Sequence, residues 1–101
     1  MRIPLILGSL LLVSACGSAR VSGEVGQACM SGGREAANAT LCSCVQRAAD
    51  QSLSAADQRR AASFFSDPQA AQDTRQSDRS GDEAFWDRYM AFVDRARARC
   101  G

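Results

Sequence analysis

The sequence predicts an all-α fold, a small disulfide-stapled bundle of three to four short helices behind a cleaved signal peptide and a flexible tether. Apolar residues recur at helical spacing through most of the chain, whereas no stretch alternates apolar with polar residues as a half-buried strand does. Five cysteines stand in a chain of 101 residues, which is one small domain at most and has little hydrophobic core of its own.

The first 15 residues have the pattern of a signal peptide, with a positive start followed by an apolar run over residues 3–13. That run is shorter than the ~20 apolar residues that a transmembrane helix needs. The motif Val-Ser-Ala-Cys at residues 13–16 resembles the lipobox of bacterial lipoproteins, in which the cysteine is acylated and becomes the first residue of the mature protein. The resemblance implies that Cys16 carries acyl chains such as palmitate.

Acylation at Cys16 would attach the protein stably to a membrane, because each buried methylene contributes ~0.8 kcal/mol and lipoproteins carry two or three chains. Gly17 follows in place of the Asp that tends to retain lipoproteins at the inner membrane. The resemblance therefore implies an outer-membrane protein whose domain faces the periplasm. An ordinary secretory cut after Ala15 is the alternative.

Three regions are predicted: the signal peptide over residues 1–15, the lipidated cysteine and flexible tether over residues 16–28, and the helical domain over residues 29–101. Residues 17–27 contain three glycines and two serines without a periodic apolar face, which is typical of a tether.

The first predicted helix covers about residues 35–51, because its apolar residues fall on one arc of a helical projection. The second opens with Ser54 as N-cap and ends before Asp67-Pro68. That dipeptide is itself a cap followed by proline at the first helical position, which favours a short third helix over residues 69–76.

The last predicted helix starts near residues 80–82, with acidic residues at its start and arginines at its end, as the helix dipole favours. Its apolar side chains fill an arc of about 160°, and Cys100, if the helix extends to it, projects near the middle of this arc. The arc consists of Phe85, Trp86, Tyr89, Met90, Phe92, Val93 and Ala96. A ligand-binding aromatic stripe is the alternative interpretation, but so small a domain has few other large apolar groups, which favours core packing.

Once Cys16 is assigned to lipid, four cysteines remain for two disulfides: Cys29, Cys42, Cys44 and Cys100. On a helix the side chains of Cys42 and Cys44 lie about 200° apart, so they cannot bond to each other. Two connectivities stay open, because loop-closure entropy does not choose between them. Cys29–Cys42 with Cys44–Cys100 is slightly favoured over Cys29–Cys44 with Cys42–Cys100.

An alternative interpretation is that Cys42 and Cys44, with Met30 nearby, form a thiol redox pair or a Cu(I) site. A zinc site is disfavoured, since the cysteine spacing is unsuited and the chain has no His. The lack of His also excludes Ser-His-Asp and Cys-His centres. We therefore expect no cofactor, no metal and no catalytic residue.

The formal net charge is +1, with the signs interspersed, which argues against nucleic acid as a partner. Removing Arg2 with the signal peptide balances the remaining side chains at 11 Arg against 11 acids. A phosphate- or lipopolysaccharide-binding patch would need several arginines to converge in three dimensions, and their spacing in the sequence does not gather them.

Five motifs of the predicted domain carry a wider resemblance: LCSCVQ at 41–46, LSAADQRRAA at 53–62, FFSDP at 64–68, RQSD at 75–78 and EAFW at 83–86. With them the chain resembles a family of small uncharacterised cysteine-containing envelope proteins of alphaproteobacteria. Some members carry an automatic label of arginine transporter, which a single small tethered domain does not support. We expect a lipid-anchored envelope protein, a non-enzymatic binding or structural module that binds an envelope protein or cell-envelope component through a polar helix face.

Overall fold

The computed structural model describes residues 21–32 and 37–101, and in these residues it contains five α-helices and no β-strand. The prediction of an all-α fold with disulfides is confirmed. The helices are α1 (Glu24–Ser31), α2 (Ala39–Ser52), α3 (Ala55–Ser66), α4 (Pro68–Gln76) and α5 (Ser80–Cys100). The predicted signal peptide, Cys16 and the start of the predicted tether lie outside the described residues.

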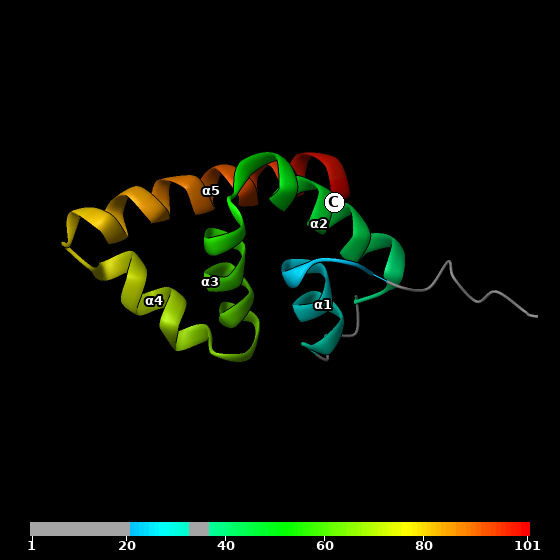
Figure 1. Cartoon of the computed structure of the whole chain (residues 1–101), viewed down its shortest axis with the longest axis horizontal. Helices are drawn as coiled ribbons and strands as arrows, with labels where there is room; N and C mark the ends of the chain where they lie inside the picture. Colours follow the sequence, from blue (N-terminus) through cyan, green and yellow to red (C-terminus); the bar gives the residue numbers. More distant parts are fainter. Residues whose placement is uncertain (1–20, 33–36) are drawn as a thin grey trace, which may run out of the picture.

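The longest helix, α5, runs along one edge of the molecule, with α2 beside its C-terminal half (Figure 1). The helices α1 and α3 lie next to each other on the same side of this pair. From the end of α3, α4 leads to the start of α5, so that α3, α4 and α5 form the sides of a triangle. Every helix therefore packs against at least two others.

The first helix, α1, lies partly in the segment that the sequence predicts to be a tether. The tether prediction is wrong for residues 24–28, because α1 begins at Glu24 and belongs to the folded domain. Val25 has no exposed surface and Cys29, four residues on, is 8% exposed, so that one face of the helix is buried. So short a helix is not recognisable in the sequence, because its few apolar side chains, with glycines and serines around them, do not show a helical period.

The second helix, α2, begins at Ala39 and not near residue 35. Asn38 has an extended backbone, and its Oδ1 accepts a hydrogen bond from the backbone N–H of Leu41 at 2.8 Å. This bond caps the helix and sets its first residue. Residue 35 lies outside the described residues, whereas Ala37 and Asn38 are not helical.

The predicted caps of α3 and α4 are confirmed. Ser54 Oγ accepts a hydrogen bond from the N–H of Asp57 at 3.2 Å. Asp67 Oδ1 accepts one from the N–H of Ala70 at 3.3 Å, and Pro68 occupies the first helical position. The first N–H groups of a helix have no backbone acceptor one turn earlier in the same helix, so the side-chain caps favour the observed starts of both helices.

The core combines small and aromatic side chains. Phe64 and Phe85 meet edge to face with ring centroids 6.0 Å apart, and alanines of α2 and α3 let the helices approach closely. Of the apolar arc predicted on α5, Phe85 and Phe92 are buried, whereas the other members are half-buried. Besides Cys29 and Cys42, the buried apolar side chains are Val25, Ala48, Ala49, Leu53, Ala61, Phe64, Phe85 and Phe92.

One ion pair joins α3 to the start of α5. Arg60 Nη2 lies 2.7 Å from Asp82 Oδ1, and the guanidinium carbon lies 4.3 Å from the centre of the Phe85 ring. Ser77 Oγ donates to Asp82 Oδ2 at 2.7 Å. This hydrogen bond, followed by that from Arg60, holds the pKa of the Asp82 carboxyl below its usual value.

A second ion pair joins the start of α3 to the middle of α5. Arg88 donates to both carboxylate oxygens of Asp57, with distances of 2.7 Å from Nε to Oδ2 and 3.2 Å from Nη2 to Oδ1. The hydrogen bonds from Arg88 lower the pKa of the Asp57 carboxyl against a smaller opposing effect of burial. Such a bidentate pair specifies orientation, so it fixes how α5 lies on α3.

The side chain of Gln46 connects three helices. It is buried, and its Oε1 accepts a hydrogen bond from the N–H of Gly26 in α1 at 2.7 Å. Its Nε2 donates to Asp50 Oδ1 and to Gln58 Oε1, each at 2.7 Å. Gly23 makes room for this amide, since its φ is +91° and a Cβ at this position would lie 2.2 Å from Gln46 Cδ.

We expect Gly23→Ala to lower the free energy of unfolding by about 2–3 kcal/mol, because its backbone region suits glycine alone and the displaced Gln46 amide loses hydrogen bonds. Gly81→Ala is the matched control, since a Cβ there meets nothing within 4 Å and replacing glycine in a helix stabilises by up to about 1 kcal/mol. Urea unfolding with the disulfides intact measures both. Equal effects of the two substitutions would contradict the role of Gly23.

Candidate functional site

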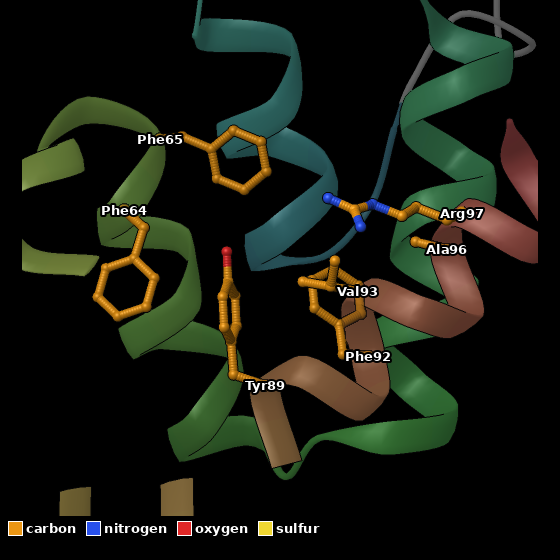
Figure 2. A pocket seen from close by; sticks show the side chains of 7 residues that line it. All are labelled: Phe64, Phe65, Tyr89, Phe92, Val93, Ala96 and Arg97. Carbon is orange, nitrogen blue, oxygen red and sulfur yellow. The ribbon is translucent and has the colours of Figure 1, made fainter. Parts of the chain in front are cut away.

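An open apolar cleft lies between the end of α3 and the C-terminal half of α5 (Figure 2). It has a volume of about 210 Å³. The lining consists of Phe64, Phe65, Tyr89, Phe92, Val93, Ala96 and Arg97. No carboxylate or cysteine lines it, so its chemistry is apolar contact together with one tyrosine hydroxyl and one guanidinium.

Buried aromatic contacts hold the floor of the cleft. Tyr89 packs edge to face on Phe64, with ring centroids 5.2 Å apart and an interplanar angle of 88°. Its centroid is also 5.9 Å from that of Phe92. Because Phe64 and Phe92 are only 7% and 4% exposed, they hold the half-buried Tyr89 ring in place, and its hydroxyl points into the cleft (Figure 2).

Two side chains of the rim approach the cleft from opposite sides. Phe65 projects from α3, and Arg97 extends over the cleft from α5 (Figure 2). Arg97 is exposed and has no carboxylate partner within the described ranges. The cleft can therefore receive an apolar group and place a negative charge next to it.

The sequence predicts Tyr89, Phe92, Val93 and Ala96 as core residues, and the rim is not among its predictions. The adjacent pair Phe64-Phe65 is the signal that indicates it. Neighbouring helical residues point about 100° apart, so one of two consecutive phenylalanines tends to leave the core. Arg97 carries no such signal, because its place at the cleft depends on how α3 packs against α5.

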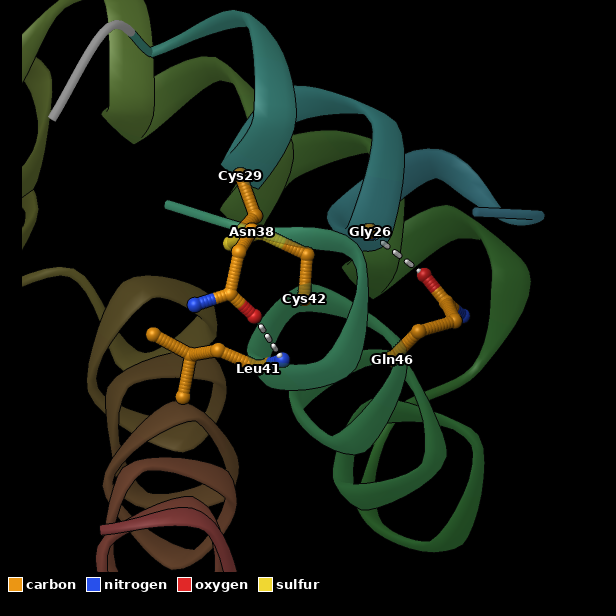
Figure 3. The surroundings of a disulfide bond; sticks show 6 residues. All are labelled: Gly26, Cys29, Asn38, Leu41, Cys42 and Gln46. Carbon is orange, nitrogen blue, oxygen red and sulfur yellow. Dashed lines mark hydrogen bonds between the residues drawn. A yellow bond between two sulfur atoms is a disulfide. The ribbon is translucent and has the colours of Figure 1, made fainter. Parts of the chain in front are cut away.

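The four cysteines of the domain form the disulfides Cys29–Cys42 and Cys44–Cys100, with Cα–Cα distances of 5.6 and 5.7 Å. This is the slightly favoured connectivity. Cys42 bonds to α1 and Cys44 to α5, as the separation of about 200° around α2 requires. Figure 3 shows the first bridge between the hydrogen bond that caps α2 and the one that the Gly26 N–H donates to Gln46.

The structure does not bring Cys42 and Cys44 together as a dithiol, because each sulfur is bonded to a different helix. Met30 is 40% exposed, whereas Cys42 has no exposed surface. In residues 21–32 and 37–101, no three or more Cys, Asp or Glu side chains gather as ligands of a metal ion. The thiol and copper interpretation therefore gains no support from this arrangement.

None of the helices in the described part of the chain has both the length and the apolar character needed to cross a bilayer. No protein-family model, curated protein or solved structure matches this chain.

We expect partial reduction by a small dithiol to release Cys44 and Cys100 before Cys29 and Cys42. The attacking thiolate must reach a sulfur atom, and Cys44 and Cys100 are half-buried beside an open hollow, whereas Cys42 is fully buried. Alkylation of the released thiols followed by peptide mass spectrometry gives the order. The disulfide-bonded protein should show no alkylated thiol before reduction, and simultaneous release of all four cysteines would contradict the expected order.

Proposed function

We propose that this chain is a lipid-anchored protein of the cell envelope whose helical domain is a non-enzymatic binding module. Acyl chains on Cys16 attach it to the outer membrane, with the domain facing the periplasm. The lipobox-like motif at residues 13–16 supports the anchor. The two disulfides support an oxidising compartment, because such bonds persist mainly in exported proteins.

The cleft between α3 and α5 is the observation that carries the binding role. Its volume of about 210 Å³ is below the roughly 300–1,000 Å³ typical of small-molecule sites. It suits instead one or two apolar side chains presented by a protein partner, as when an amphipathic helix lies in a groove.

The charge of the rim specifies this partner further. Arg97 is exposed at the edge of the cleft and has no carboxylate of the described chain within ion-pair distance. The occupant is therefore a segment of an envelope protein that carries a large apolar side chain next to an Asp or Glu. Phe65 and Tyr89 supply the aromatic contacts on which binding energy usually concentrates.

Cys16→Ser should abolish attachment to the membrane, since the thiol is the group that is acylated. Cell fractionation and the mass of the processed chain measure this. We expect the substituted protein either in the soluble periplasmic fraction or with its signal peptide uncut. Cleanly processed protein that stays in the membrane fraction after a high-salt wash, which removes molecules held by charge alone, would contradict the proposed anchor.

A photo-crosslinking residue in place of Phe65 should capture a specific envelope protein in intact cells, because this side chain lies at the rim of the cleft. The same residue in place of Gln72, which is exposed on α4, is the control. Adding Arg97→Glu should lower the yield of the crosslinked product at position 65 by about tenfold, as expected for reversing a charge beside a carboxylate.

Three results would contradict the proposed cleft function. One is an equal yield of crosslinked product at positions 65 and 72. Another is a yield at position 65 that Arg97→Glu leaves unchanged. The third is a crosslinked species of twice the mass of this chain, which would identify a second copy as the occupant.

A further inference from the structure

Three arginines converge where α2 and α5 lie side by side. The two helices run antiparallel, joined at one point by Cys44–Cys100 and at another by a hydrogen bond of 3.0 Å from Arg95 Nη1 to Gln51 Oε1. Arg47 of α2 and Arg99 of α5 line the same open hollow between these two connections. We call Arg47, Arg95 and Arg99 the arginine face.

No ion pair neutralises the arginine face within the described residues. The hollow is lined by Cys44, Arg47, Ala48, Gln51 and Arg99, without a carboxylate. The ion pairs formed within the described residues belong to Arg60 and Arg88, and neither Arg47 nor Arg99 has an acidic side chain within 4.0 Å. Asp50 lines a neighbouring hollow together with Arg47 but forms no ion pair with it.

The helix geometry of α5 separates Arg95 and Arg99 from the nearest acids of the same helix. At about 100° per residue, Arg95 and Arg99 project within roughly 40° of each other. Asp87 and Asp94 project roughly 80–100° away from Arg95, on a different face of the helix. The disulfide at Cys100 and the hydrogen bond that Arg95 donates to Gln51 hold the α5 arginines beside Arg47.

The arginine face also lies close to the proposed lipid anchor. Ser22, at the start of the described chain, lines one hollow together with Arg47. The chain from Cys16 to Ser22 can span at most roughly 20 Å even when fully extended. An anchor at Cys16 therefore keeps Arg47 near the lipid headgroups, where the field of an anionic surface extends about 8–10 Å into solution.

We propose that Arg47, Arg95 and Arg99 bind the phosphate groups of an anionic lipid surface and so orient the domain on the membrane. The guanidinium group suits this ligand, because its planar fork donates two hydrogen bonds to one phosphate. The proposal rests on the anchor under "Proposed function" for the proximity of the membrane, but the chemistry of the face is independent of acylation.

The test uses the complete mature chain, residues 16–101, with Cys16→Ser and both disulfides formed. Binding is measured by co-sedimentation at low ionic strength with vesicles of phosphatidylcholine alone and vesicles that also contain phosphatidylglycerol. We expect preferential binding to the anionic vesicles. Arg47→Gln with Arg99→Gln should weaken it about 30-fold, since each arginine near such a surface contributes a factor of about five.

The matched control is Arg59→Gln with Arg75→Gln, which removes the same charge from exposed positions on α3 and α4. This control should change the affinity for the anionic vesicles by no more than about twofold, because those side chains lie outside the arginine face. Circular dichroism checks that all variants remain helical.

Several outcomes would overturn the proposal. An equal loss in both double variants would mean that net charge alone acts, and equal binding to both kinds of vesicle would mean that no anionic surface is recognised. Binding of inorganic phosphate without a preference for anionic vesicles would assign the face to a small free anion. Because the chain tested carries no acyl group, these results do not depend on the anchor, which the fractionation of Cys16→Ser tests separately.

Discussion

The arrangement of the domain depends on two cysteines of α2 that project on nearly opposite sides of the helix. Cys42 bonds to α1 and Cys44 to α5, so α2 lies between them and both disulfides begin on one helix. The core contains few large side chains, and a chain of this size buries too little apolar surface to select one helix arrangement unaided. The disulfides supply that selection by limiting the unfolded ensemble and the neighbours that α2 can have.

Polar contacts between the helices stabilise the same arrangement as the disulfides. The buried amide of Gln46 satisfies the N–H of Gly26 and also meets Asp50 and Gln58, so α1, α2 and α3 share one hydrogen-bonded group. No buried side-chain nitrogen or oxygen in the described part of the chain lacks a partner. This matters because an unsatisfied buried amide costs about 1–3 kcal/mol, enough to favour a different packing in a domain this small.

The sequence is most informative where local chemistry decides the structure. Ser54 and Asp67 indicate the starts of α3 and α4 because capping involves only residues close in the chain, and C-x-C excludes a bond between its own cysteines by helix geometry. Helix α1 could not be predicted, because its burial depends on Gln46, which lies twenty residues after Gly26 in the chain. The cleft and the arginine face could not be predicted for the same reason, since each forms only when α5 packs against another helix.

The long last helix contributes to both proposed surfaces. At about 100° per residue, Arg97 projects roughly 160° away from both Arg95 and Arg99 around α5. Phe92 and Ala96, which also line the cleft, project only about 20–60° away from Arg99. The rim of the cleft at Arg97 therefore points away from the arginine face, whereas the floor of the cleft does not. An arginine face that lies on lipid phosphates would turn Arg97 away from the bilayer. Lipid phosphates and the carboxylate of a protein partner would then meet arginines on different sides of this helix.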